Sequence, residues 1–182
     1  MRKVILYIAT SVDNYIARKD GSVDWLDTTP KPKNHDYGYH AFYESVDTTI
    51  MGNATYKEIL TFDIPFPYPD KTNYVFSRTA QPDNSDVRYI LSEIPSFISE
   101  LKGQEGKDIW LIGGGEINTL LMDHELIDEI IITRIPTILG QGLPLFAGAL
   151  TESGLTLEKL EDFGNGIIQM MYKPVPKSEI RF

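Results

Sequence analysis

The 182-residue chain contains no cysteine and only three histidines, His35, His40 and His124. The absence of cysteine excludes disulfide bonds, cysteine nucleophiles and metal sites built from thiolates. His35 and His40 are five residues apart and do not share one face of a helix, so a metal centre built from histidines is not expected either. The sequence thus predicts chemistry without a bound metal ion.

Basic residues are also scarce, because 17 Lys and Arg stand against 26 Asp and Glu. The net charge of −9 argues against a nucleic-acid-binding surface and against attraction to anionic membranes. An anionic ligand would have to be held by local backbone donors and a few cations. No apolar segment approaches the length of a membrane span, and the run at residues 4–9 is too short for a secretion signal, so we expect a cytoplasmic protein.

What is present is a regular alternation of short apolar runs and amphipathic segments, which ends in two runs joined through Gly164-Asn165-Gly166. This order predicts an α/β protein with a mostly parallel, mixed central sheet and a C-terminal antiparallel hairpin. We predict one domain over residues 1–173 and a tail over 174–182. The expected strands are 4–9 in the centre of the sheet, 48–51, 73–77, 87–91, 109–112, 127–135, 155–163 and 167–173, and the expected helices are 35–46, 54–60, 95–102 and one that starts at 115.

The most informative segment is the apolar run 109–112, which leads through Gly113-Gly114-Gly115 directly into a helical pattern. A strand that turns through bare glycines into a helix leaves backbone N–H groups unpaired, and the helix dipole adds partial positive charge there. Such a corner suits a phosphate group. The alternative is that the glycines only let the helix pack close to the sheet. The spacing is not that of the G-x-G-x-x-G dinucleotide fingerprint.

A second corner of the same kind occurs at Met51-Gly52-Asn53-Ala54-Thr55. A predicted strand again ends at glycine, and the following helix starts with residues that can cap it. The simpler reading is that Thr55 only caps its own helix. Two such corners in one sheet nevertheless favour a cofactor whose two halves are linked by a pyrophosphate.

Five sequence blocks follow one another along the chain: S-V-D-N-Y-I-A, I-M-G-N-A-T-Y, P-Y-P-D-K-T-N-Y-V-F-S-R, W-L-I-G-G-G-E and I-I-I-T-R-I. This order resembles the dihydrofolate reductase superfamily, from residue 1 to about residue 146. The blocks G-G-G-E-I-N-T-L-L-M and P-T-I-L-G-Q-G-L-P-L-F are closer to the reductase domain of riboflavin biosynthesis, and the chain is similar to stand-alone members of that family. The resemblance implies the three-layer dihydrofolate reductase-like fold.

The resemblance also implies hydride transfer from a reduced nicotinamide cofactor. The residues that it implies for cofactor binding are the backbones of Ala9 and Ile16 at the nicotinamide, Gly52, Asn53, Thr55, Gly113, Gly114 and Gly115 around the pyrophosphate, and Ser77 near the adenosine end. Dihydrofolate reductases place an arginine for the 2′-phosphate where this chain has Asn53. Arg78 is the predicted replacement, which favours NADPH over NADH, unless Arg78 is an ordinary surface residue.

On the substrate side, the resemblance implies Thr133 beside the pocket and Asp13 in the mobile loop, and Trp25 is a further candidate contact. No carboxylate aligns cleanly with the acid of the folate reductases, because that region is rebuilt around residues 28–34. Asp36 is the predicted proton donor, together with Thr133 as a catalytic candidate. The alternatives are solvated surface charges at Asp36 itself and at its neighbours Asp24, Asp27 and Glu44.

Aromatic residues near the expected mouth of the site are candidates for stacking on a flat heterocycle, and the alternative for each is core packing or a dimer contact. They are Tyr15, Trp25, Tyr37 and Phe66. Two segments are predicted to form a homodimer interface, the proline- and aromatic-rich residues 65–69 and the segment 139–146.

The leading hypothesis is an NADPH-dependent reductase of a small heterocyclic substrate, resembling 5-amino-6-(5-phosphoribosylamino)uracil reductase. Two departures from the family pattern argue against a phosphoribosyl substrate. Tyr43 replaces an expected arginine, and Ile112 replaces an expected glutamate. One alternative is a dihydrofolate reductase with a rearranged substrate acid. The other is a nucleotide- or flavin-binding protein without catalysis, because the sequence shows no clear proton donor.

Overall fold

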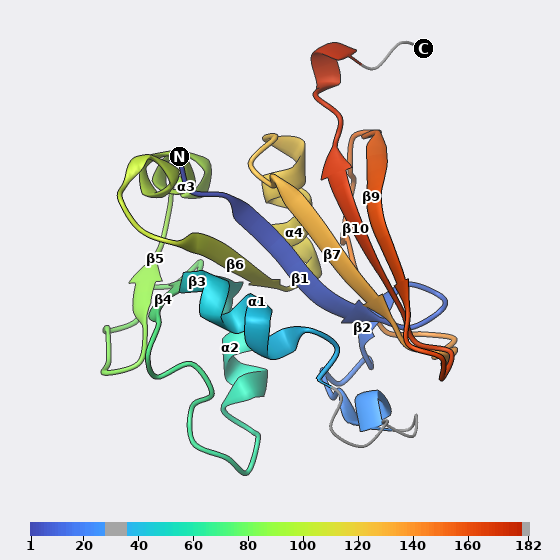
Figure 1. Cartoon of the computed structure of the whole chain (residues 1–182). Helices are drawn as coiled ribbons and strands as arrows, with labels where there is room; N and C mark the ends of the chain where they lie inside the picture. The colour runs from blue at the N-terminus through green and yellow to red at the C-terminus, as the bar shows by residue number, and fades with distance from the viewer. Residues whose placement is uncertain (28–35, 180–182) are drawn as a thin grey trace.

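The computed structural model describes residues 1–27 and 36–179 of the chain, and within these residues eight strands form one sheet (Figure 1). Their order across the sheet is β5-β4-β3-β6-β1-β7-β10-β9. The strands are β1 (Val4–Thr10), β3 (Val46–Gly52), β4 (Thr72–Phe76), β5 (Arg88–Ile90), β6 (Asp108–Gly113), β7 (Glu129–Arg134), β9 (Leu155–Asp162) and β10 (Ile168–Pro174). A small second sheet pairs β2 (Tyr15–Ala17) with β8 (Leu143–Pro144).

The sheet is mostly parallel, and β10 is the strand that runs against its neighbours. β1 pairs in parallel with both β6 and β7, which confirms that the first strand is central. β10 pairs antiparallel with β7 and with β9, which confirms the C-terminal hairpin. The carboxyl ends of β3, β6, β1 and β7 therefore lie along one edge of the sheet, where α/β proteins bind their ligands.

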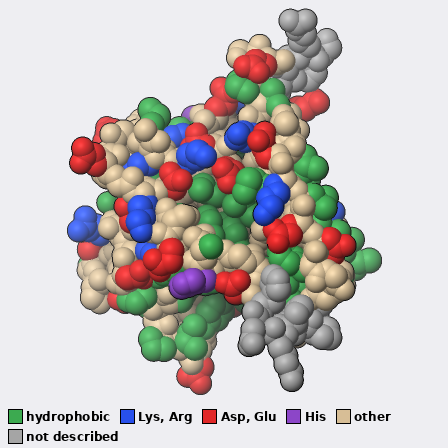
Figure 2. All heavy atoms as spheres, viewed as in Figure 1, with side chains coloured by type: hydrophobic (Ala, Val, Ile, Leu, Met, Phe, Trp, Pro, Cys, Tyr) green, Lys and Arg blue, Asp and Glu red, His purple; other side chains and the backbone are tan. Residues whose placement is uncertain are grey.

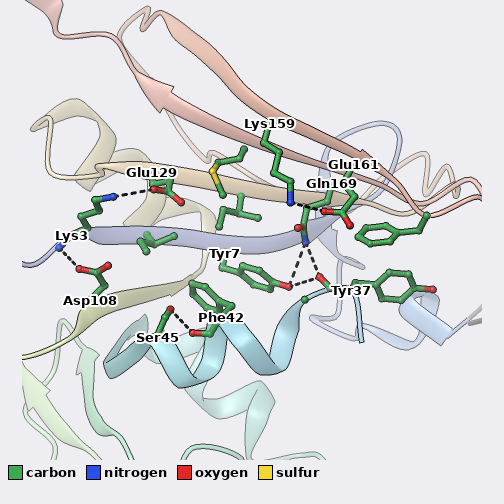
Figure 3. Close-up of a pocket in the computed structure, with 15 residues that line it drawn as sticks. Lys3, Tyr7, Tyr37, Phe42, Ser45, Asp108, Glu129, Lys159, Glu161 and Gln169 are labelled. Carbon is green, nitrogen blue, oxygen red and sulfur yellow. Dashed lines mark hydrogen bonds and ion pairs between the residues drawn. The ribbon is translucent and has the colours of Figure 1, made fainter. Parts of the chain in front are cut away.

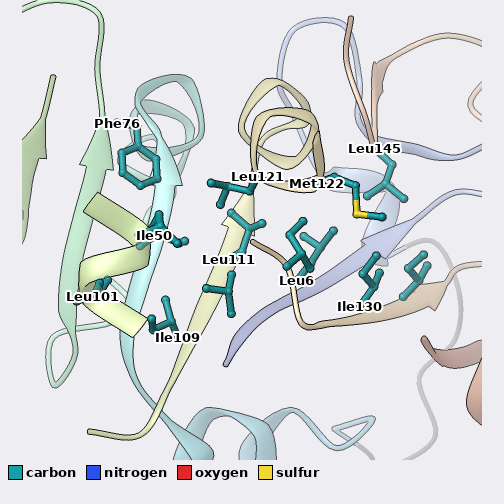
Figure 4. Close-up of a cluster of buried hydrophobic side chains, with 14 residues drawn as sticks. Leu6, Ile50, Phe76, Leu101, Ile109, Leu111, Leu121, Met122, Ile130 and Leu145 are labelled. Carbon is teal, nitrogen blue, oxygen red and sulfur yellow. The ribbon is translucent and has the colours of Figure 1, made fainter. Parts of the chain in front are cut away.

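Helices cover both faces, so the predicted three layers are present (Figure 1). α3 (Ile94–Gly103) and α4 (Gly115–Asp123) bury the face that carries Leu6, Leu111 and Ile130 (Figure 4). On the opposite face, α1 (Tyr39–Ser45) packs Phe42 against Ile5, Trp110 and Ile131, and α2 (Asn53–Ile59) packs Tyr56 and Ile59 against β3 and β4.

Most predicted elements are present with ends shifted by one or two residues. The largest difference is the helix expected at 35–46, which begins at Tyr39. Tyr37 and Gly38 have φ angles of 55° and 78°, so the backbone turns through left-handed conformations there and cannot be helical. Residue 35 and the insert 28–34 lie outside the described residues. The sequence also did not predict β2 and β8, which are too short to show a period.

After β10 ends at Pro174, the chain forms a short 3-10 helix, η2 (Lys177–Glu179), and residues 180–182 lie outside the described part. Whether residues 174–182 behave as a separate tail stays a prediction. In the described ranges 1–27 and 36–179, no helix is long and apolar enough to cross a membrane.

Candidate cofactor and substrate site

The two glycine corners lie next to each other at the carboxyl ends of β3 and β6. Met51 pairs with Gly113 across the two strands. A Cβ atom built on Gly52 would lie 3.9 Å from the backbone nitrogen of Gly114, and one built on Gly114 would lie 3.2 Å from Thr55 Oγ1. The fold therefore brings together corners that are about 60 residues apart in sequence, as the sequence predicted.

Both helices that start at these corners lack a side-chain cap. The N-cap residues are Gly52 for α2 and Gly114 for α4, and neither terminus receives a hydrogen bond from a capping side chain. The simple reading that Thr55 caps α2 is therefore not what the structure shows. In the described residues, the side chains of Asn53 and Thr55 form no hydrogen bond, so both keep polar groups available, and the Thr55 hydroxyl lies beside the start of α4.

A buried asparagine points its unused acceptor toward the same corner. Asn118, in the first turns of α4, is fully buried, and its Nδ2 donates to the carbonyl of Leu145 at 2.8 Å. Its Oδ1 has no hydrogen-bond partner among the described residues, and a Cβ atom built on Gly113 would lie 3.7 Å from it. Unpaired buried polar atoms are rare in folded proteins, and they often mark functional positions. Sequence reasoning missed Asn118, although it stands three residues after Gly115.

The third glycine of the block has a packing role. A Cβ atom on Gly115 would lie 2.4 Å from the carbonyl oxygen of Pro144 and 3.0 Å from Ala147 Cβ. Gly115 thus allows close packing, as in the alternative reading, but against the segment 144–147 and not against the main sheet. Gly113 is different, because its φ angle of +123° belongs to a backbone conformation that favours glycine.

The structure separates the two residues that were predicted for the adenosine end of a cofactor. Ser77 is buried, and its hydroxyl donates to the carbonyl of Thr79 at 2.8 Å, so it shapes the turn after β4. Arg78 extends into solvent and places Nη2 2.6 Å from Glu116 Oε2, in the first turn of α4. Arg78 therefore does lie beside the glycine corner, and Glu116 is a competing partner that sequence reasoning missed.

Asp13 ties two loops together at the end of β1. It accepts hydrogen bonds from the Ser11 hydroxyl at 2.7 Å and from the backbone N–H groups of Leu139 and Gly140 at 3.1 and 2.7 Å. The Ser11 hydroxyl above all, and then the two backbone groups, hold the pKa of Asp13 below its usual value. The loop it closes brings the end of β1, with Ala9, close to β2, with Ile16.

A pocket of about 400 Å³ lies between α1 and the strands β9 and β10, on the face of the sheet that α1 covers (Figure 3). Tyr7, Tyr37 and Gln169 line it toward the carboxyl edge, and Lys3, Asp108 and Glu129 line the other end. Figure 2 shows hydrophobic side chains in this hollow with charged side chains around it. β1 alone separates β6 from β7, so the Tyr7 end of the pocket and the glycine corners share one sheet edge.

Tyr7, Tyr37 and Gln169 form the polar wall at that end, and the buried Thr133 is hydrogen-bonded to it through Gln169. Gln169 Nε2 donates to Thr133 Oγ1 at 2.9 Å and to the carbonyl of Tyr37 at 3.2 Å, and it lies 3.5 Å from the Tyr7 hydroxyl. Thr133 pairs with Ala9 on one side and with Gln169 on the other, so these side chains share one face of the sheet. Among the described residues, Gln169 Oε1 has no hydrogen-bond partner, which leaves it for a ligand.

Tyr7 is held rigidly in this wall. Its ring stacks on Phe42 with centroids 4.1 Å apart, and its hydroxyl donates to the Tyr37 carbonyl at 3.3 Å. Burial raises the pKa of Tyr7 above its usual value, so the hydroxyl keeps its proton at neutral pH. Sequence reasoning missed Tyr7 and Gln169. The sequence could have predicted Tyr7, because it stands two positions before Ala9 in the same strand and therefore projects from the same face.

The predicted acid, Asp36, lies at the start of α1. Its carboxylate accepts hydrogen bonds from the backbone N–H groups of Gly38 and His40 at 3.1 and 2.9 Å. Asp36 is close enough to the Tyr7 hydroxyl to influence its pKa. It therefore shapes the backbone at the rim of the pocket, and its role as a proton donor stays a prediction.

Of the stacking candidates, Tyr37 lines the pocket. Trp25 is fully buried and packs with Ile135 and Ile167, so the structure places it in the core and not on the pocket surface. Phe66 packs against Tyr56 and Tyr68, beyond α1.

Comparison with known proteins identifies the family. The RibD C-terminal domain family matches residues 2–169. The protein YwjB of Bacillus subtilis is 43% identical over 169 residues, which cover 91% of this chain and 95% of YwjB. The chain belongs to the RibD C-terminal domain family.

Solved structures agree with this family and its fold. A putative riboflavin biosynthesis protein from Shewanella sp. PV-4 superposes with a TM-score of 0.86 at 33% identity, covering 95% of this chain and 99% of that protein. Dihydrofolate reductase from Enterococcus faecalis superposes with a TM-score of 0.63 at 15% identity, covering 94% and 96%. The second likeness shows the fold alone. The RibD C-terminal domain of this chain thus has the dihydrofolate reductase-like fold.

A longer relative places this domain in context. RibD of Corynebacterium ammoniagenes is 26% identical over 165 residues, which cover 82% of this chain and 48% of RibD. The chain therefore spans about half the length of that relative.

Proposed function

We propose that this RibD C-terminal domain protein is an NADPH-dependent reductase of a small heterocyclic substrate, resembling 5-amino-6-(5-phosphoribosylamino)uracil reductase. One observation carries the proposal: two strand–glycine–helix corners lie side by side at the carboxyl edge of the sheet, and neither has a side-chain cap. A relative structure from Thermotoga maritima bears that reductase name, and the Enterococcus faecalis dihydrofolate reductase structure contains NADP(H).

The donors at the corners fit a dinucleotide pyrophosphate. The start of α4 carries the partial positive charge of its nine-residue helix, and no side chain caps it. The hydroxyl of Thr55, which has no partner in the described chain, would add a donor from the other corner. The bound cofactor would supply the hydride, and Ala9 and Ile16 would orient its nicotinamide.

The polar wall of the pocket would bind and protonate the substrate. Reduction of a polar double bond adds a hydride to one atom and a proton to the other, so a proton donor is needed. The Tyr7 hydroxyl is protonated at neutral pH and lies at the cofactor end of the pocket. Gln169 Oε1 would accept a hydrogen bond from the substrate and fix its orientation. Asp36, at the rim, is the alternative donor.

Preference for the 2′-phosphate rests on Arg78. Its guanidinium lies beside the start of α4, where it pairs with Glu116. An incoming 2′-phosphate would compete with the Glu116 carboxylate for the Arg78 guanidinium. Because this site is exposed, the new ion pair would add only a small binding free energy. Affinity for NADPH would then exceed affinity for NADH by a modest factor.

The proposal is tested by binding first and turnover second. NADPH should raise the melting temperature of the protein and should bind in a calorimetric titration. If NADPH does neither, the reductase proposal fails. If NADPH binds, its consumption is compared with the ribosylaminopyrimidinone substrate and with dihydrofolate. Turnover of dihydrofolate alone would support a dihydrofolate reductase with a rearranged acid, and binding without turnover would favour a nucleotide-binding protein.

A further inference from the structure

The pocket between α1 and the C-terminal hairpin extends well beyond its polar wall. Lys3, Ile5 and Tyr7 line it in turn, because side chains two residues apart on an extended chain project from the same face. The four-residue step from Tyr7 to Lys3 spans about 13 Å. Figure 3 shows Tyr7 and Lys3 at opposite ends of the pocket. A heterocycle held at Tyr7 would therefore direct a long substituent toward Lys3.

Two carboxylates flank Lys3 at that end. Asp108 begins β6 and Glu129 begins β7, the two strands on either side of β1. The backbone N–H of Lys3 donates to Asp108 Oδ1 at 2.8 Å, and Lys3 Nζ lies 3.5 Å from Glu129 Oε2. We call Lys3, Asp108 and Glu129 the charged end of the pocket. One cation faces two anions there, so this end is negative.

Lys3 is poorly placed to bind a phosphate group. Its side chain is 53% exposed, whereas the side chain of Glu129 is only 12% exposed. A phosphate that took Lys3 as its partner would leave the largely enclosed Glu129 carboxylate without a cation, and an enclosed unpaired charge is costly. The phosphate would also lie beside that carboxylate, and like charges in contact oppose binding. Glu129 thus disfavours an anionic substituent.

The second lysine of the pocket does not reverse this charge. Lys159 lies 2.8 Å from Glu161 Oε2, so this pair adds no net charge. Both lysines that line the pocket in the described chain are therefore paired with carboxylates. The three carboxylates and two lysines of the lining leave it with one net negative charge.

The charged end offers hydrogen-bond acceptors. Among the described residues, Asp108 Oδ2 and Glu129 Oε1 have no hydrogen-bond partner, and ionised carboxylates accept hydrogen bonds but donate none. Hydroxyl groups can donate to these oxygens, whereas a phosphate dianion has only acceptors to present. At the other end, Gln169 Oε1 is likewise an acceptor. The charged end therefore fits an uncharged substituent that carries hydroxyl groups.

We propose that the substrate reduced in this pocket carries an uncharged polyhydroxyl substituent, such as a ribosyl group without phosphate, and that Glu129 excludes the phosphorylated form. The inference rests on the proposed reductase function and names the substrate class for the same pocket. It sets this chain apart from the relative from Thermotoga maritima, whose name specifies a phosphoribosylamino compound.

The test compares 5-amino-6-ribosylaminouracil with its 5′-phosphate as substrates for NADPH oxidation. In the wild type, kcat/KM should be at least tenfold higher for the compound without phosphate. Glu129→Gln removes the charge and keeps the shape of the side chain, so it should reduce this preference at least fivefold. The matched control is Glu158→Gln, which alters a β9 glutamate outside the pocket that pairs with Lys173 at 3.3 Å. This control should keep the wild-type preference.

The possible results separate this inference from the proposed function. Equal or better reduction of the phosphate, an unchanged preference in Glu129→Gln, or the same change in Glu158→Gln would overturn the inference and leave the reductase function standing. If neither compound is reduced, the proposed function fails, and calorimetric titration of both compounds into the protein tests the inference by itself. Tighter binding of the unphosphorylated compound supports it. Equal or tighter binding of the phosphate, or binding of neither compound, overturns it.

Discussion

The glycine corners, proposed to hold the cofactor, and the polar wall, proposed to bind the substrate, lie on the same edge of the sheet, but they are built in different ways. Each glycine corner is one continuous segment, 51–55 or 113–115, in which a strand, a turn and a helix start follow directly in sequence. The polar wall takes Tyr7, Tyr37 and Gln169, with Thr133 bonded to Gln169, from four separate segments. The corner depends on local backbone geometry, whereas the wall depends on strand register.

The difference predicts that the two regions can be damaged separately. Tyr7→Phe should lower kcat by about a hundredfold, because the wall loses its proton donor, while NADPH affinity stays unchanged. The measurement is steady-state kinetics together with a direct NADPH titration. Asp36→Asn is the matched comparison, and a larger loss of kcat in that variant would move the donor role from Tyr7 to Asp36.

The pH profile sharpens this assignment. The pKa of Tyr7 is raised above its ordinary value of 10.0, so its hydroxyl stays protonated through neutral pH and loses its proton only in strongly alkaline solution. Activity that depends on this proton should therefore be flat across neutral pH. A carboxyl donor would instead make activity fall between acidic and neutral pH.

Gly115→Ala should destabilise the folded protein at the second glycine corner. The new Cβ would overlap the carbonyl oxygen of Pro144, so the free energy of unfolding should fall by about 2 kcal/mol. The control is Gly103→Ala at the end of α3, where a Cβ meets nothing within 4 Å. Chemical denaturation measures both. Equal stability of the two variants would show that the segment around Pro144 yields to the new side chain.

Substitutions of two threonines in or next to β3 should affect NADPH affinity and stability separately. Thr55→Val should weaken NADPH binding about tenfold and leave stability unchanged, because the Thr55 hydroxyl has no partner in the described chain. Thr49→Val should do the reverse: the buried Thr49 hydroxyl donates to Asn73 Oδ1 at 2.7 Å, and its loss should cost about 1–2 kcal/mol of stability. Calorimetric titration and thermal unfolding give both readouts. A loss of stability in Thr55→Val would assign that residue a structural role.

The smallest expected effect concerns Arg78. Glu116→Gln removes its carboxylate partner, so NADPH affinity should rise by a few-fold while NADH affinity is unchanged. Arg78→Ala should lower NADPH affinity alone. If Arg78→Ala binds both cofactors as the wild type does, Arg78 is an ordinary surface residue.

The contrast between local corners and a wall built from distant segments also explains how much of the structure could be predicted from the sequence. The central strand, the hairpin and both glycine corners were predictable, because apolar periodicity and glycine position are local signals. Tyr37 and Gln169 meet only because β10 pairs with β7 in one register and the backbone turns at Gly38. The β-bulge at Glu158, where β9 pairs with β10, also leaves no mark in the alternation of residues. Asp36 was predicted inside a helix over 35–46, but α1 begins at Tyr39 and Asp36 lies exposed before it, where it accepts backbone hydrogen bonds.

The central claim is that the paired glycine corners hold the cofactor, and the NADPH affinity of Gly114→Ala tests it most directly. The added Cβ would stand 3.2 Å from Thr55 Oγ1, between the two corners, and its variant is compared with Gly103→Ala in the same titration. We expect at least a tenfold loss of NADPH affinity in Gly114→Ala, with both variants shown to be folded by thermal unfolding. Equal NADPH affinity in the two folded variants would contradict it.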